Sequence, residues 1–274
     1  MLKQRLITAV ILIPLVVLAI LNLSSDVLNW FIALVAGLAA WEWLTLIGIV
    51  DPIRRLLWVS GLFVLTQIFT AVLPLGFVVL LTVVAWTAAS VVIIQFRHTG
   101  LPRQLNTLFQ SPVFGVATMI GLLAIFWSAS ISLHRNPLGP EQFLYVLVTV
   151  WLADTGGYFA GKQWGHSPLA KVVSPNKTWQ GVYGALVLTG IWAVIAYMLG
   201  INGSLPFIAW LLLTLLTVAV SIVGDLFESL FKRSHQVKDS GDLLPGHGGV
   251  LDRIDSLIAA VPVFVAGLML LGTI

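Results

Sequence analysis

Residues 205–233 read LPFIAWLLLTLLTVAVSIVGDLFESLFKR, an apolar run that passes directly into a charged segment. The apolar part, residues 205–224, has the length of about 20 residues that a helix needs to cross the hydrocarbon core of a membrane. In the charged part, the polar residues share one side of a helical wheel: Asp225, Glu228, Ser229, Lys232 and Arg233. The stretch therefore predicts a spanning helix with an amphipathic extension. On this extension, Lys232 and Arg233 fit a functional role and a role as surface charges that extend to the membrane interface equally well.

The rest of the chain has the same apolar character. Of its 274 residues, 59% are hydrophobic and 9% are charged, against about 25% charged residues in a soluble domain. Runs of spanning length recur along it, at residues 6–23, 28–49, 56–73, 76–95, 113–132, 142–160, 179–200, 205–224 and 254–273. We therefore predict an all-α integral membrane protein with about nine transmembrane helices and a cytoplasmic amphipathic helix.

The basic residues predict the orientation of these spans. With the N terminus in the cytoplasm, every Lys and Arg except Arg135 falls on the cytoplasmic side, as loop charges prefer. The C terminus then faces outward, and we expect a cytoplasmic (inner) membrane location with the functional site facing the cytoplasm. Because the basic residues lie between apolar spans, they indicate topology and anionic-lipid contacts, and no nucleic-acid partner is expected.

The polar residues divide the chain into two regions. Residues 1–140 hold about five spans, and residues 141–274 hold about four spans together with the long polar cytoplasmic loops 161–178 and 225–253. Residues 225–255 alone contain ten of the twenty-five charged residues of the chain. We therefore expect a catalytic C-terminal region.

Two aspartates in this region predict a metal site. Asp225 closes the apolar run, and Asp252 opens the next span, with Asp255 one turn later on the same helix face. Helix N termini favour carboxylates, so one of the latter pair is expected to cap its helix. Asp225 and Asp252 on adjacent helices offer the hard oxygen ligands that Mg²⁺ takes together with substrate phosphates. The chain has no cysteine, so thiolate sites are excluded.

Other polar residues point to an anionic ligand. Between these aspartates lies PGHGG at residues 245–249, where glycines let backbone N–H groups approach an anion. Asp154 lies within an apolar span, where a carboxylate either has a functional role or forms a hydrogen bond that holds two helices together. In SPNKT at residues 174–178, Ser174 and Thr178 supply hydroxyls, and Lys177 can neutralise a triphosphate or mark topology. Glu42 also lies within a span, and the sequence does not decide between a functional and a structural role for it.

The C-terminal half resembles the phosphatidate cytidylyltransferase family. The resemblance rests on SLFKR at residues 229–233, KDSG at 238–241 and PGHGGVLDRID at 245–255. Further matches lie upstream, at Asp154, Gly157, Tyr158, Gly161, Lys162, Ser174, Pro175, Lys177, Thr178 and Gly181. The family often has a second lysine at the position of Asn176 and an acidic residue at that of Gln180. These two departures leave Lys177 and the paired aspartates in place.

The resemblance implies transfer of a cytidylyl group from CTP to phosphatidic acid, which gives CDP-diacylglycerol and pyrophosphate. It implies Mg²⁺, with room for a second cation, bound by Asp225 and Asp252, and a possible homodimer. It assigns phosphate contacts to Lys177, Lys232, Arg233, Lys238 and Arg253, and orienting or metal-assisting roles to Asp239, Asp255 and His247. The remaining residues expected at the substrate are Asp154, Ser174, Asn176, Thr178, Ser229, Gly248 and Gly249.

Three alternatives remain open from the residues alone. A CTP-dependent lipid kinase would use the same metal and cations but a hydroxyl acceptor. A transporter or ion relay would use Asp154 and Glu42 within the membrane, although the charges gather at one membrane face. An inactive relative would serve as a membrane scaffold.

Overall fold

The computed structural model describes residues 2–243 and 248–274, with side chains from Val10 onward. The helices are α1 (Leu2–Asn22), α2 (Ser25–Leu46), α3 (Pro52–Val72), α4 (Leu75–Phe96), α5 (Arg103–Phe109), α6 (Pro112–His134), α7 (Gly139–Trp164), α8 (Trp179–Met198), α9 (Phe207–Ser234) and α10 (Leu251–Leu270). Two strands, β1 (Pro168–Ala170) and β2 (Ser174–Thr178), form an antiparallel pair between α7 and α8.

The long helices confirm an integral membrane protein. Within the described residues, eight helices are long and apolar enough to cross a membrane, namely α2, α3, α4, α6, α7, α8, α9 and α10. Each of the nine predicted ranges falls on one long helix. The first of them lies on α1, whose apolar part within the described side chains is the shorter stretch Val10–Asn22, so the ninth span stays a prediction.

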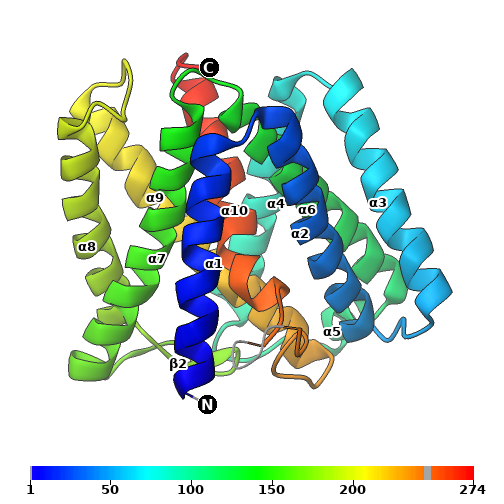
Figure 1. Ribbon diagram of the computed structural model, residues 1–274. Helices are drawn as coiled ribbons and strands as arrows, with labels where there is room; N and C mark the ends of the chain where they lie inside the picture. Colours follow the sequence, from blue (N-terminus) through cyan, green and yellow to red (C-terminus); the bar gives the residue numbers. More distant parts are fainter. Residues whose placement is uncertain (1, 244–247) are drawn as a thin grey trace.

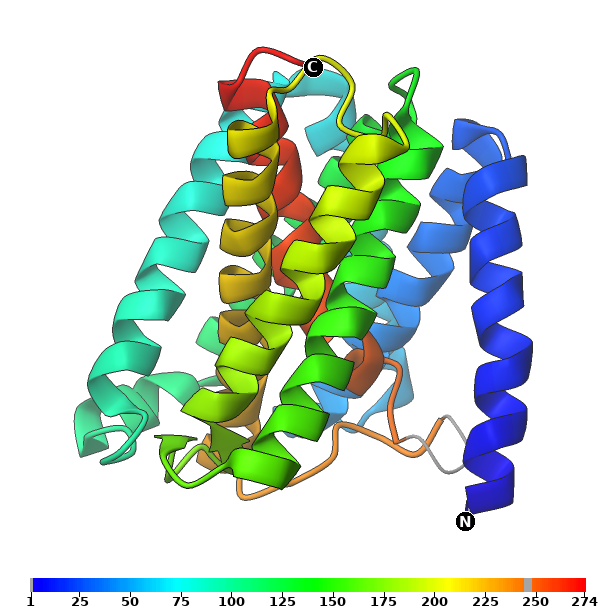
Figure 2. The same cartoon turned by 90° about the vertical axis from the view of Figure 1, so that its left-hand side faces the viewer.

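The helices stand side by side as one bundle, with the two termini at opposite ends (Figure 1). The N terminus lies at the same end as β2, α5 and the segment that follows α9. Helix α10 runs through the middle of the bundle, and Val261 and Phe264 on it are fully buried. Helix α1 lies at the edge of the bundle, as the turned view shows (Figure 2).

The buried core is continuous across the predicted boundary at residue 140. Trp43 of α2 packs on Phe231 of α9 with ring centroids 4.8 Å apart, and Phe109 of α5 packs on the same ring at 5.4 Å. Both contacts belong to a single cluster of buried side chains that runs from α1 to α10. Helices of the N-terminal region therefore support the C-terminal part of α9, where the charged residues begin.

The two predicted polar loops are partly regular structure. Residues 225–234 continue α9 as the predicted amphipathic extension, so the loop predicted at 225–253 begins only after Ser234. Residues 161–164 continue α7, and the rest of loop 161–178 contains the paired strands. The polar sequence of β2 has no apolar alternation, which is the signal that predicts a strand. The strands and the seven-residue helix α5 are therefore additions to the predicted all-α fold.

Helices α7 and α8 touch through glycines. A Cβ atom on Gly156 would lie 2.6 Å from the backbone oxygen of Gly184, and one on Gly184 would lie 2.3 Å from the Cβ of Ala160. Such distances are shorter than any ordinary contact, so this crossing needs residues without side chains. Close packing of small residues is typical of helix pairs in membranes. It fixes the spacing between α7, which carries Asp154, and α8, which begins directly after the strand that carries Lys177.

Candidate functional site

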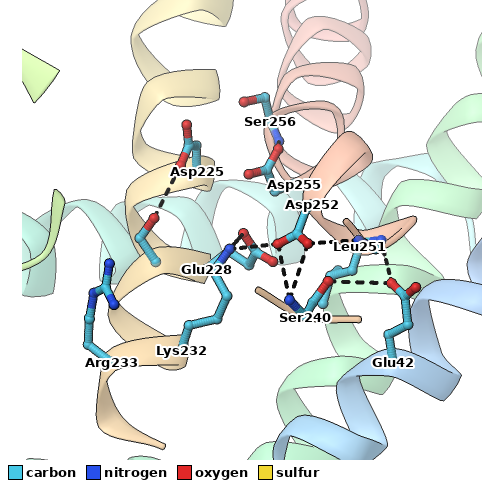
Figure 3. A network of polar contacts seen from close by, with 12 residues as sticks. Glu42, Asp225, Glu228, Lys232, Arg233, Ser240, Leu251, Asp252, Asp255 and Ser256 are labelled. Atoms are coloured by element: carbon cyan, nitrogen blue, oxygen red, sulfur yellow. Dashed lines mark hydrogen bonds and ion pairs between the residues drawn. The ribbon is translucent and has the colours of Figure 1, made fainter. Parts of the chain in front are cut away.

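Four acidic residues gather where α9 meets α10, and we call Asp225, Glu228, Asp252 and Asp255 the carboxylate cluster (Figure 3). The two helices come close because Gly224 has no side chain: a Cβ there would lie 2.9 Å from the backbone oxygen of Asp255. The charge of Asp255 interacts with those of Asp225 and Glu228. The structure thus brings the predicted pair Asp225 and Asp252 to facing helices and adds two further carboxylates.

Lys232 joins the two helices from within this cluster. Its Nζ donates to Glu228 Oε2 at 2.8 Å, one helical turn earlier on α9, and to Asp252 Oδ1 at 2.7 Å on α10. The side chains of Lys232, Glu228 and Asp252 are only 12%, 5% and 10% exposed. The predicted phosphate-contacting lysine is therefore engaged with two carboxylates. Its position neutralises part of a strongly acidic site.

Backbone N–H groups fix Asp252 further. Ser240 N donates to both carboxylate oxygens at 3.3 and 3.1 Å, and Gly249 N donates to Oδ2 at 2.9 Å. The Gly249 N–H group does contact an anion, but that anion is a carboxylate of the chain itself, so contact of this segment with an anionic ligand stays a prediction. Gly248 has φ +81°, a conformation that glycine adopts without strain.

Asp225 connects this cluster to the strands. Its Oδ2 forms an ion pair with Lys177 of β2, and its Oδ1 accepts from Ser229 Oγ at 3.3 Å. The side chains of Lys177 and Asp225 are 29% and 25% exposed, so this pair is far more accessible than the pairs of Lys232. Arg233 provides a second link, because its Nε donates to the backbone oxygen of Val173 at 3.4 Å.

A cavity of about 320 Å³ lies beside this link, and we call it the α7–α8 pocket. Its polar lining consists of Tyr158 and five predicted site residues: Asp154, Ser174, Asn176, Lys177 and Thr178. Its apolar lining includes Val182 and Ala185 of α8 and Ile222 of α9. The upstream residues, which the sequence could only group by type, thus share one cavity that adjoins the carboxylate cluster through Lys177.

Two polar residues of the pocket lining differ in what they contact. Asp154 is exposed and makes no hydrogen bond within the described residues, and its charge interacts with those of Lys177, Asp225 and Arg253. Asp154 therefore does not hold two helices together through a hydrogen bond within the described residues. Thr178 Oγ1 instead accepts from Gly181 N at 3.2 Å and caps the N terminus of α8.

The remaining predicted site residues fall into two groups. Lys238 and Asp239 are exposed in the segment after α9, and Arg253 is exposed on α10. His247 lies outside the described residues. The structure therefore places these three described residues near the site without assigning them a ligand.

The sequence missed two contributions to this site. Glu228 lies on the predicted polar face, three residues after Asp225 and four before Lys232, but no role was assigned to it. Its Oε1 is buried and has no hydrogen-bond partner within the described residues. Glu42 accepts from the N–H groups of Val250 and Leu251 and so caps α10, while Asp252 lies in the first turn of this helix and accepts from Gly249 N. Spacing along α9 could have indicated Glu228.

Comparisons with known proteins agree on one chemistry. The model of the cytidylyltransferase family matches residues 3–271. A phosphatidate cytidylyltransferase of Pseudomonas aeruginosa is 41% identical over 278 aligned positions, which cover 99% of this chain and 98% of that protein. That of Haemophilus influenzae is 36% identical over 281 positions, which cover 96% and 97%. That of Bacillus subtilis is 41% identical over 129 positions, which cover 47% of this chain and 48% of that protein.

Proposed function

We propose that this chain, which belongs to the cytidylyltransferase family, carries out its reaction where the α7–α8 pocket meets the carboxylate cluster. The reaction is transfer of a cytidylyl group from CTP to phosphatidic acid. The observation that carries this placement is the ion pair between Lys177 and Asp225, because it joins a pocket lined with hydrogen-bonding side chains to a cluster of carboxylates.

The reaction needs positioning and charge neutralisation more than a protein nucleophile. A phosphate oxygen of phosphatidic acid attacks the α-phosphorus of CTP, a new P–O bond forms, and the bond to the β-phosphate oxygen breaks to release pyrophosphate. The attacking phosphate is already anionic, so no side chain has to remove a proton from it. Lys177 is placed to receive negative charge from the phosphates, with Ser174, Asn176 and Thr178 as further polar contacts in the pocket.

The donor set suits Mg²⁺. Within the described residues, no group of three His, Asp or Glu side chains is arranged to enclose a metal. Mg²⁺ is usually held by one or two carboxylates, with phosphates and water completing the shell. Asp225 and Asp252 would hold it, and the unpartnered Oε1 of Glu228 offers a further oxygen for a second cation. When bound, Mg²⁺ supplies positive charge to the nucleotide phosphates.

The distribution of basic residues supports a proposed location for this site in the cell. The pocket is lined by residues of β2, and Lys177 of β2 pairs with Asp225 of the cluster. Strand β2 lies at the end of the bundle that holds the N terminus and α5 (Figure 1). Lysines and arginines concentrate in the loops of that end, and such loops face the cytoplasm. We therefore place the site at the cytoplasmic face of the inner membrane. A homodimer remains a prediction that light scattering of the detergent-solubilised protein can test.

Two measurements test the proposal. With phosphatidic acid and CTP labelled at the α-phosphate, label should enter the lipid, whereas CTP labelled at the γ-phosphate should leave it unlabelled; the reverse result would establish a kinase reaction. Asp252→Asn should reduce incorporation of the α-label about a thousandfold, because loss of a metal ligand removes several kcal/mol of charge stabilisation. A folded variant with undiminished turnover would remove the cluster from the proposed site.

A further inference from the structure

Glu42 of α2 is an acidic residue buried at the inner end of the bundle. It is 3% exposed, and no Lys or Arg side chain within the described residues forms an ion pair with it. An isolated buried carboxylate costs several kcal/mol unless donors compensate it. The burial of Glu42 must therefore be compensated by hydrogen-bond donors, and these donors do not come from the α7–α8 pocket.

The compensation comes from the N terminus of α10. Val250 N donates to Glu42 Oε1 at 3.0 Å, and Leu251 N donates to Oε2 at 2.8 Å. The first N–H groups of a helix have no partner within the helix, and the helix dipole favours negative charge there. A side chain from the N-terminal region thus caps the helix that carries Asp252, although 208 residues separate the two partners of the first bond.

The chain is shaped closely around this carboxylate. A Cβ atom on Gly249 would lie 2.4 Å from Glu42 Oε2, and one on Gly241 would lie 2.8 Å from Oε1. Ser240 Oγ adds a third, longer contact to Oε2 at 3.4 Å. The segments on both sides of residues 244–247 therefore meet at Glu42, and two of the contact positions accept no side chain.

The same residues hold Asp252. Ser240 contacts Glu42 through its hydroxyl and donates its N–H to the Asp252 carboxylate (Figure 3). Gly249, where a Cβ atom would collide with Glu42, donates its N–H to Asp252 Oδ2. A displacement of this segment would move both N–H donors away from Asp252. Trp43, the next residue of α2, packs on Phe231 of α9 and so ties the same helix to the other side of the cluster.

We propose that Glu42 is a positioning residue for cytidylyl transfer: it anchors the segment around Ser240 and Gly249 and thereby sets the Asp252 carboxylate for metal binding. This inference rests on the proposed role of Asp252. Residues that orient a metal ligand typically contribute about 10–100-fold to metal affinity or activity. The N-terminal region then contributes to the reaction as well as to membrane anchoring.

The test is Glu42→Gln, which keeps the shape of the side chain but turns an N–H₂ group towards the donors Val250 and Leu251. We expect kcat to fall about 10–100-fold and the Mg²⁺ concentration for half-maximal activity to rise by a similar factor. The KM for CTP should change less than about threefold, because Glu42 does not line the pocket. A purely structural role would lower yield or thermal stability and leave the Mg²⁺ dependence of the surviving protein unchanged.

Matched variants keep the outcome decisive. Glu141→Gln makes the same exchange at an exposed position on α7 and should leave kcat and Mg²⁺ dependence unchanged. If Glu42→Gln does not fold, Ser240→Ala removes the hydroxyl contact to Glu42 and retains the N–H that binds Asp252; a raised Mg²⁺ requirement supports the inference, and an unchanged one overturns it. Loss of activity in Asp252→Asn with full activity in Glu42→Gln defeats this inference alone, whereas full activity in Asp252→Asn defeats the proposed site.

Discussion

The carboxylate cluster and the α7–α8 pocket differ in how completely their polar groups are bonded. In the cluster, Lys232 holds two carboxylates at exposures of 12% or less, and three backbone contacts fix Asp252. In the pocket, Asp154 makes no hydrogen bond within the described residues. Apart from Glu228 Oε1, the bonds of the cluster are made before substrate arrives, whereas the pocket offers the Asp154 carboxylate without a hydrogen-bond partner among the described residues. The lining of the pocket is suited to binding a ligand, and the cluster is suited to holding charges in fixed positions.

The ion pair between Lys177 and Asp225 is the exchange point between these two regions. Each residue neutralises the other in the structure, and both keep more than a fifth of their side-chain surface exposed. Phosphates entering the pocket would attract Lys177, and a cation accompanying them would attract Asp225. We therefore expect substrate and metal to replace this pair together, while the buried bonds of Lys232 persist. Substitutions in the cluster should then mainly reduce stability, and substitutions in the pocket should mainly change turnover or substrate binding.

Lys232→Met should give the largest change in stability. It would leave the buried carboxylates of Glu228 and Asp252 without their cation, which typically costs about 3–5 kcal/mol. Unfolding in mixed micelles by increasing fractions of denaturing detergent measures the free energy. Lys171→Met changes an exposed lysine and is the control. A loss of activity without a loss of stability would instead show that Lys232 acts on the substrate, as the sequence first suggested.

Lys177→Met should affect turnover and leave stability nearly intact. Removing one group that stabilises developing charge typically costs about 100–1,000-fold in kcat, whereas a partly exposed pair contributes about 1 kcal/mol or less to folding. Initial rates with varied CTP measure kcat and KM, with Lys171→Met again as the control. Lys177→Arg should recover part of the activity, because the charge is kept. Equal losses of stability in Lys177→Met and Lys232→Met would remove the distinction between the two regions.

Gly156→Ala tests the helix contact that forms the pocket. The added Cβ would meet the backbone oxygen of Gly184 at 2.6 Å, and backbone cannot move aside without shifting α8. Overpacking of this kind costs about 1–3 kcal/mol. Thermal unfolding in detergent should show the loss, together with weaker CTP binding. At Gly190 of the same helix pair an added Cβ meets nothing within 4 Å, so Gly190→Ala should be neutral or slightly stabilising.

The sequence predicted the parts of this molecule that depend on local pattern. The apolar runs gave the long helices, and the period of α9 placed Asp225, Glu228 and Lys232 on one face. Motif spacing grouped Asp225 with Asp252 and indicated the residues around Lys177. These signals are local because a membrane helix satisfies its backbone internally and its side chains show one repeating period.

The parts that could not be predicted are contacts between distant segments. The burial of Glu42 is suggested by its apolar surroundings, but its partners Val250 and Leu251 depend on how α2 packs against α10. Lys232 was expected to meet a phosphate, and its actual contact with Asp252 likewise depends on a second helix. Hydropathy and periodicity predict which face of a helix is buried, but they do not predict which residue of another helix contacts that face.

Asn176→Ala should give the smallest effect and show whether the pocket acts through binding. The amide of Asn176 lines the cavity beside Lys177, but no hydrogen bond within the described residues fixes it. One such bond to a substrate contributes about 0.5–1.5 kcal/mol, which corresponds to about a two- to twelvefold rise in the KM for CTP. The value of kcat should stay within about twofold, since binding contacts that are equal in ground and transition states change KM alone. Steady-state rates with CTP varied at saturating phosphatidic acid measure both constants. A fall in kcat that exceeds the rise in KM would place Asn176 with the fixed charges of the cluster, and the boundary between the two regions would then lie on the pocket side of Lys177.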